Sequence, residues 1–279
     1  MSERDFEVMG VVNVTPDSFS DGGSFRSIDD ARRHIERLIH DGADVIDIGG
    51  ESTRPQGAEP VDADEELRRV LPVVEAIVRD APSVPVSVDT VKSRVAAAAL
   101  EVGASIVNDV SGFRLDREMA SVCARRGAGV VLMHSRGDVA DMGTFRWAVY
   151  GEDVVGEVID ELRLRLGDAQ RAGIAREHIV VDPGIGFAKR SEHSLAVLAQ
   201  LRRVGELGFP VLVGVSRKRF IGELTGAATP AQRVGGTVGA NVAALERGAL
   251  LFRVHDVKPN REALDVAWAV QQADRMAAP

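Results

Sequence analysis

The chain has 279 residues, of which 45% are hydrophobic and 27% charged, and this composition excludes a disordered or fibrous protein. Its net charge of -8, with no Lys/Arg-rich run that could form a nucleic-acid stripe, argues against nucleic acid as a partner. The first residues, MSERDFEVMG, lack the features of a signal peptide, and no apolar stretch is long enough to cross a bilayer. We therefore expect a cytoplasmic protein with no membrane partner.

Apolar runs of strand length alternate along the chain with longer segments of helical spacing, as in parallel βαβ units. The eight runs are 6–14, 44–50, 84–90, 105–110, 129–134, 178–184, 210–216 and 250–256. The helical segments are 29–41, 63–80, 91–102, 117–126, 153–173, 191–207, 230–248 and 259–276. The pattern predicts an α/β fold, a TIM (β/α)8 barrel, with residues 1–279 in a single domain. A doubly wound open sheet is the alternative, but no G-x-G-x-x-G turn follows Val14.

Polar residues at the carboxyl ends of barrel strands converge on one mouth, where TIM-barrel active sites lie. In chain order, this rule selects Asn13, Gly49 to Glu51, Asp89, Asn108 and Asp109, His134, Asp182, Ser216 to Lys218, and Arg253 to Asp256. We expect the active site among these residues. His134 is kept out of the catalytic set, because one His after an apolar strand is equally well explained as a structural donor.

The loops after the first two strands carry possible ligands. Asn13 begins a turn-rich loop, and its side-chain oxygen suits Mg²⁺, which takes few protein ligands together with phosphates. Arg54 follows two glycines and is a candidate for holding a carboxylate or phosphate. The simpler interpretation is an ordinary flexible loop and a solvated arginine.

Three later strand ends offer acceptors and an amide, from Asp89, Asn108 and Asp182. An aspartate in such a position often only caps a helix or turn. Three such groups at one mouth nevertheless favour a pocket for a polar ligand with several donors, such as the edge of a pterin.

Cations gather at the last two strands. Residues 217–219 are consecutive cations at the start of a helical region, where the helix dipole disfavours them, so we expect Lys218 to contact a ligand. Arg253 and His255 alternate in the last strand and therefore share a face. With Asn13 they predict a diphosphate site. The alternative for 217–219 is a solvated basic turn. Cys123 is the only cysteine and is expected to be a small buried residue.

Seven motifs carry a family resemblance: MGVVNVTPDSFSDGG, DIGGESTRP, SVDT, IVNDVSG, VVDPGIGFAK, GVSRKRF and RVHDV. With these motifs in this order, the chain resembles dihydropteroate synthase from end to end. The resemblance implies a transferase of folate biosynthesis that joins a dihydropterin methyl diphosphate to p-aminobenzoate and releases diphosphate. It also implies Mg²⁺ as cofactor, a homodimer, and inhibition by sulfonamides.

The resemblance further implies roles for individual residues. The pterin is held by Asp89, Asn108, Met133, Asp182 and Lys218. The diphosphate is held by Asn13, Arg253 and His255, with Asn13 also on the metal. The p-aminobenzoate site is built by Phe19, Ser52, Thr53, Arg54, Pro55, Phe187 and Lys218. The catalytic set is Lys218, Asp89 and Arg253. Departures from the family pattern occur at 135–138 and at Arg219.

Two other functions remain to be distinguished. A methyltetrahydrofolate-binding domain of a corrinoid methyltransferase is similar at the pterin positions, but it has no use for a diphosphate site. A catalytically silent pterin-binding paralogue would be expected to lose part of the loops or of the 216–218 segment.

Overall fold

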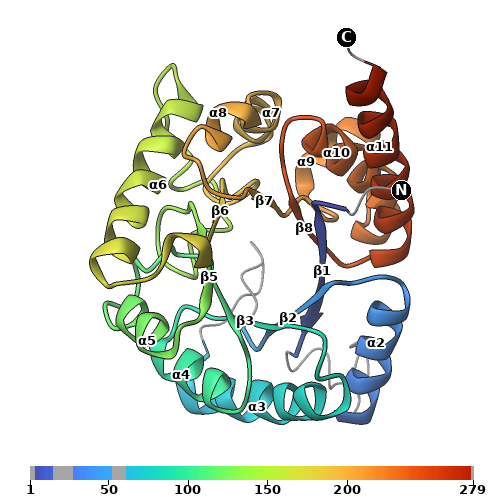
Figure 1. The fold of residues 1–279 in the computed structure, drawn as a ribbon. Helices are drawn as coiled ribbons and strands as arrows, with labels where there is room; N and C mark the ends of the chain where they lie inside the picture. Colours follow the sequence, from blue (N-terminus) through green and yellow to red (C-terminus); the bar gives the residue numbers. More distant parts are fainter. Residues whose placement is uncertain (1–3, 15–27, 52–60, 278–279) are drawn as a thin grey trace.

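The computed structural model describes residues 4–14, 28–51 and 61–277. Its strands form one parallel sheet in the order β6-β5-β4-β3-β2-β1-β8-β7. The strands of the described chain are β1 (Glu7–Asn13), β2 (Val45–Gly49), β3 (Val86–Asp89), β4 (Ile106–Asp109), β5 (Gly129–Met133), β6 (Ile179–Asp182), β7 (Leu212–Val213) and β8 (Leu251–Val254). A parallel bridge between Val181 and Val211 joins the two ends of the sheet. The predicted TIM barrel is confirmed (Figure 1).

Helices surround the sheet on the outside (Figure 1). They are α2 (Ile28–His40), α3 (Ala63–Asp80), α4 (Ser93–Glu101), α5 (Met119–Arg126), α6 (Val154–Arg171), α7 (Ser191–Ala199), α8 (Leu201–Gly205), α9 (Arg219–Thr225), α10 (Val234–Leu245) and α11 (Val257–Ala277). The apolar spacing explains their packing: α2, for example, buries Ala31, Ile35 and Leu38 on one face. Among the described helices, none has both the length and the apolar character needed to cross a lipid bilayer.

Three sequence expectations need correction. The segment 191–207 is two helices, because Gln200 leaves the helical region with φ -109° and ψ 25°. The segment 230–248 begins as a 3-10 turn, Pro230–Arg233, before α10. The segment 219–225 forms α9, which is too short for helical periodicity to be seen in the sequence.

The two-residue period of the strands determines which side chains reach the mouth. Met9, Val45, Val131 and Leu212 pack together in a small core cluster inside the barrel, with Ile106, Val180 and Leu251 against it. Residues two positions further along each strand point the same way and lie nearer the carboxyl end. They include Asp47, Asn108, Met133, Asp182 and Arg253. A dry apolar layer therefore supports a polar layer above it.

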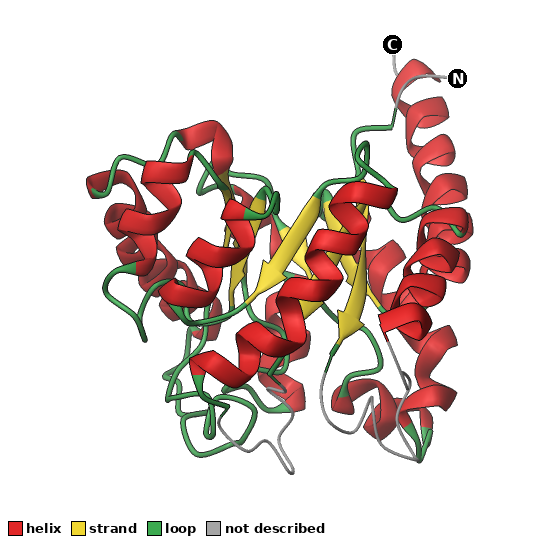
Figure 2. Cartoon of the chain, turned by 90° about the horizontal axis from the view of Figure 1, so that it is seen from below, coloured by secondary structure: helices red, strands yellow, loops and turns green. Residues whose placement is uncertain are grey.

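The strands run toward one end of the molecule, and the chain termini lie at the other (Figure 2). The described loops that follow the strands gather at the carboxyl end, as in other TIM barrels. Cys123 is buried in the main core, as expected, and burial raises the pKa of its thiol to about 12.

Candidate active site

A cavity opens at the carboxyl end of the barrel. It is lined by Asp89, Asn108, Val110, Met133, Asp182, Phe187, Gly214, Ser216, Lys218, Arg253 and His255. Every residue that the resemblance assigned to the pterin lies in this lining, together with Arg253 and His255. Asn13 ends β1, where it pairs with Gly49 of β2. The strand β1 lies directly beside β8, the strand that carries Arg253. Phe19 and residues 52–55 lie outside the described residues.

Arg253 is held by two carboxylates in the barrel interior. Its Nε donates to Oδ2 of Asp47 at 2.6 Å, and a terminal nitrogen donates to Oδ2 of Asp89 at 2.7 Å. The Nδ2 group of Asn108 donates to the same Oδ2 of Asp47 at 3.1 Å. The sequence analysis predicted that Arg253 would need an anionic partner. The carboxylates of Asp47 and Asp89 supply part of that negative charge.

Asp47 is a site residue that the sequence analysis missed. It is fully buried, and its second oxygen, Oδ1, has no hydrogen-bond partner within the described part of the chain. A buried carboxylate without a strong partner is costly, so its pairing with Arg253 is needed to keep it there. It lies two residues after the inward-facing Val45, but every residue of β2 is buried, so alternation in the sequence did not show this orientation.

The carboxylates of the cavity have perturbed acidities. Burial raises the pKa of Asp89 to about 7, against the opposing effect of the Arg253 guanidinium. Burial also raises the pKa of Asp182, and the nearby Lys218 ammonium opposes it. Burial alone would lower the pKa of Arg253, but the carboxylates of Asp47 and Asp89 outweigh it and raise that pKa. Arg253 therefore stays cationic at any physiological pH.

Lys218 lies between the cavity and the loop after β6. Its Nζ donates to the backbone oxygen of Ile185 and lies 4.4 Å from the ring centroid of Phe187. Burial lowers its pKa to about 8, although the Asp182 carboxylate opposes this shift. Lys218 is also the residue before the first turn of α9, where the sequence placed it.

The neighbours of Lys218 have other partners. Arg217 forms an ion pair with Asp256 at 2.6 Å, with the Arg217 backbone in the left-handed region at φ 58°. Arg219, where the sequence departs from the family pattern, stacks over Phe145 at 4.2 Å. Only the central cation of the three lines the cavity.

His255 contacts the segment that follows β7. Its Nδ1 lies 2.9 Å from Oγ of Ser216, and its backbone N–H donates to the same oxygen at 3.1 Å. Ser216 thereby fixes the ring position of His255 at the cavity wall.

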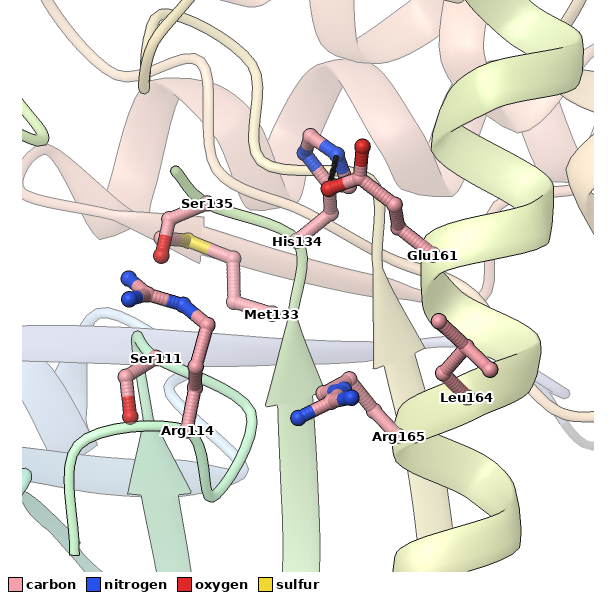
Figure 3. Close-up of a pocket in the computed structure, with 8 residues that line it drawn as sticks. All are labelled: Ser111, Arg114, Met133, His134, Ser135, Glu161, Leu164 and Arg165. Carbon is pink, nitrogen blue, oxygen red and sulfur yellow. Dashed lines mark ion pairs between the residues drawn. The ribbon is translucent and has the colours of Figure 1, made fainter. Parts of the chain in front are cut away.

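His134 belongs to a second pocket, between the ends of β4 and β5 and helix α6 (Figure 3). This pocket has a volume of about 240 Å³ and is lined by Ser111, Arg114, Met133, His134, Ser135, Glu161, Leu164 and Arg165. The His134 Nε2 lies 3.1 Å from a Glu161 oxygen, and burial lowers the pKa of His134 to about 4. Its close contacts are protein groups, which agrees with a structural role.

The loop after β5, which departs from the family pattern at 135–138, forms ion pairs with α6. Arg136 forms ion pairs with Glu157 at 2.7 Å and with Glu161 at 2.5 Å.

Within the described ranges, no group of three or more His, Cys, Asp or Glu side chains is placed to hold a metal ion.

Comparisons with known proteins decide the family. The model of the family described as "Pterin binding enzyme" matches residues 9–255. The dihydropteroate synthase of Bacillus subtilis is 46% identical over 90% of this chain and 84% of its own length. That of Synechocystis sp. is 43% identical over 94% of this chain and 89% of its own. The chain belongs to the dihydropteroate synthase family.

Solved structures agree with this family. A dihydropteroate synthase of Xanthomonas albilineans with 4-aminobenzoic acid is 48% identical, with a TM-score of 0.88, over 99% of this chain and 95% of that one. The Yersinia pestis dihydropteroate synthase, solved with a sulfonamide drug, is 39% identical, with a TM-score of 0.88, over 95% of this chain and 94% of that one. As a dihydropteroate synthase, the chain is a transferase of folate synthesis, and a cobalamin-linked binding module is disfavoured.

Proposed function

We propose that this chain condenses (7,8-dihydropterin-6-yl)methyl diphosphate with p-aminobenzoate, giving 7,8-dihydropteroate and diphosphate. The observation that carries the proposal is the cavity itself, where acceptors on β3, β4 and β6 face cations on β8 and just before α9. Relatives from Xanthomonas albilineans have been solved with 4-aminobenzoic acid and with 7,8-dihydropteroate.

The pterin is assigned to Asp89, Asn108, Met133, Asp182 and Lys218. Asp182 offers a buried carboxylate that can accept from paired donors on a pterin ring. Because Nδ2 of Asn108 is committed to Asp47, Oδ1 is the atom that its amide offers to a ligand. Met133 supplies an apolar wall.

The diphosphate is assigned to Arg253, His255 and Asn13. Mg²⁺ fits this donor set only as an ion that arrives with the substrate, because Asn13 offers one neutral oxygen and the Arg253 guanidinium would repel a bare cation. Phosphate oxygens and water would complete its coordination shell, as Mg²⁺ prefers. When bound, the ion would neutralise part of the diphosphate charge. Turnover that continues unchanged in excess chelator would contradict the Mg²⁺ assignment.

The p-aminobenzoate site is assigned to Phe19, Ser52, Thr53, Arg54, Pro55, Phe187 and Lys218. Among the described members, the ammonium of Lys218 and the ring of Phe187 already stack on each other. This contact keeps an aromatic face and a cation side by side, as an aromatic carboxylate requires.

For the chemical step, we propose that the C–O bond breaks before the amine attacks. Diphosphate leaves with the bonding electron pair, the cation is delocalised into the dihydropterin ring, and the amine lone pair then forms the C–N bond as one amine proton is released. Arg253 stabilises the departing charge, Asp89 supports Arg253 and the pterin, and Lys218 stands beside Asp182. These three residues form the proposed catalytic set.

Two experiments test this account. Diphosphate release is measured from dihydropterin methyl diphosphate with and without p-aminobenzoate, and release that is not accompanied by dihydropteroate would contradict the synthase reaction. An oxygen label is placed between the pterin methylene carbon and the diphosphate. If the C–O bond breaks reversibly, this label should scramble into the non-bridging positions of the same phosphate before amine is added. Retention of the label, with full turnover once amine is present, would favour direct displacement.

We also propose that residues 1–279 act as a single domain, because the described members of the assigned sites all come from one barrel. From the family resemblance we propose a homodimer in the cytoplasm. Light scattering coupled to gel filtration checks the dimer, and a monomeric mass at working concentration would contradict it.

A further inference from the structure

Lys189 is one of the largest fully buried side chains of the described residues. It lies in the loop between β6 and α7, which begins directly after Asp182 and also carries Phe187. The proposed reaction does not use its side chain. A lysine is rarely buried to this extent unless its ammonium is well paired.

The ammonium of Lys189 has three close acceptors. Its Nζ lies 2.8 Å from Nδ1 of His134, 3.1 Å from the backbone oxygen of Gly184 and 3.2 Å from the backbone oxygen of Phe187. An ammonium has three N–H donors and accepts nothing, so the three contacts use its full capacity. Two of the acceptors belong to the loop that presents Phe187.

The state of His134 follows from this contact. Burial lowers the pKa of Lys189 to about 7. In its protonated form the ammonium only donates, so Nδ1 of His134 accepts and the neutral ring carries its proton on Nε2. That nitrogen faces Glu161 of α6 at 3.1 Å, drawn as a dashed line in Figure 3. The lowered pKa of His134, due first to its burial, agrees with a neutral ring. The loop is thus anchored through Lys189 to His134, directly after β5.

The loop needs such an anchor, because its backbone is unusual. Gly184, Gly186 and Ala188 all have positive φ, at 68°, 78° and 46°. A side chain at Gly184 would collide with the backbone oxygen of His134, since an added Cβ would lie 1.9 Å from it. A non-glycine residue in the left-handed region, such as Ala188, is held there by its surroundings.

We propose that Lys189 is a positioning residue that holds the β6–α7 loop, and through it Phe187, in the geometry required for p-aminobenzoate. The proposal rests on the assignment of Phe187 to the p-aminobenzoate site under the proposed function. Lys189 touches neither substrate in this scheme, because its three donors are already used within the protein.

A double-mutant cycle tests whether Lys189 acts through Phe187. The KM for p-aminobenzoate is measured for the full chain, for Lys189→Met, for Phe187→Ala and for the double variant. We expect Lys189→Met to raise this KM about tenfold in the parent but less than about twofold in the Phe187→Ala background, since coupled residues are not additive. A general loss of folding would give equal effects in both backgrounds, and that result would overturn the proposal.

Two further variants sharpen the test. Lys189→Gln keeps two N–H donors on a shorter side chain, so its KM should fall between those of the parent and Lys189→Met, and it also serves if the Met variant does not fold. Lys258→Met, at an exposed lysine of α11, is the matched control and should leave the KM unchanged. Equal KM values for the parent, the Gln variant and the Met variant would overturn the proposal.

The outcomes separate this inference from the proposed function. If Phe187→Ala raises the KM for p-aminobenzoate while Lys189→Met does not, only the positioning role falls. If Phe187→Ala leaves the KM unchanged, the assignment of Phe187 to the p-aminobenzoate site fails, and the role of Lys189 fails with it.

Discussion

Arg253 of β8 donates to Asp47 of β2 inside the barrel, with 2.6 Å between Nε and Oδ2. The two strands are not neighbours, because β1 lies between them in the sheet. The same Asp47 oxygen accepts from Asn108 of β4. One buried carboxylate therefore orients a cation assigned to the diphosphate and an amide assigned to the pterin.

The first prediction concerns this carboxylate. Asp47→Asn leaves the shape but removes the charge that pairs with Arg253, and should lower kcat/KM by about 10- to 100-fold, as expected for a hydrogen bond to a charged group worth about 1.5–3 kcal/mol. Asp265→Asn, in a half-exposed pair with Arg4, is the control and should change kcat/KM very little. Unchanged kinetics in Asp47→Asn would show that Arg253 does not depend on this pair.

A second prediction separates two buried aspartates, each at the carboxyl end of its strand. Asp182 lines the cavity, whereas Asp109 accepts from the backbone N–H groups of Ser111 and Phe113 within its own loop. Asp182→Asn should weaken binding of 6-hydroxymethylpterin, measured by calorimetry, by about 1.5–3 kcal/mol. Asp109→Asn should instead lower the free energy of unfolding by about 1–3 kcal/mol, because it leaves a buried donor without an acceptor. Tight pterin binding by Asp182→Asn would remove Asp182 from the pterin site.

The pH dependence of kcat/KM for the pterin diphosphate is the third prediction. Asp89 must be ionised to pair with Arg253, and its pKa of about 7 makes activity rise as the pH increases through 7. Lys218 must be protonated, and its pKa of about 8 makes activity fall as the pH increases through 8. We therefore expect a narrow bell-shaped dependence of kcat/KM on pH. Asp89→Asn should lose the acid limb and keep the alkaline limb; an unchanged acid limb would assign that limb to another group.

The Asp89 shift also has a consequence for stability. A carboxylic acid whose pKa is raised in the folded state binds its proton more tightly there than in the unfolded chain. Its contribution to the free energy of unfolding is therefore present at low pH and is lost as the pH rises toward 7. The stability difference between the parent and Asp89→Asn should change over this range, and denaturant titrations at pH 5 and pH 8 check it.

The fourth prediction is that sulfonamides compete with p-aminobenzoate. Both present an aniline and an acidic group, and Phe187 and Lys218 offer an aromatic face and a cation together. The apparent KM for p-aminobenzoate should rise linearly with sulfonamide concentration while the maximal rate stays constant. Inhibition that excess p-aminobenzoate does not relieve would contradict a shared site.

The sequence alone determined the alternation of strands and helices, and with it the barrel. It also identified the mouth residues, because carboxyl ends of parallel strands meet at one end. Asp89, Asn108, Asp182, Lys218, Arg253 and His255 do lie around one cavity. Local patterns were sufficient to find these residues, because the extent of each apolar strand and the polar residue at its end can both be recognised in the sequence.

The tertiary structure alone decided which charges are paired with one another. Asp47 lies in a strand whose residues are all buried, so hydrophobic alternation does not show which of them face the barrel interior. Its partner Arg253 is 206 positions away, and Lys189 and His134 are 55 positions apart. The same limit applies to the helix break at Gln200, which is a backbone conformation and not a change in composition. Burial and pairing depend on neighbours that are distant in sequence, and only the folded chain brings those neighbours together.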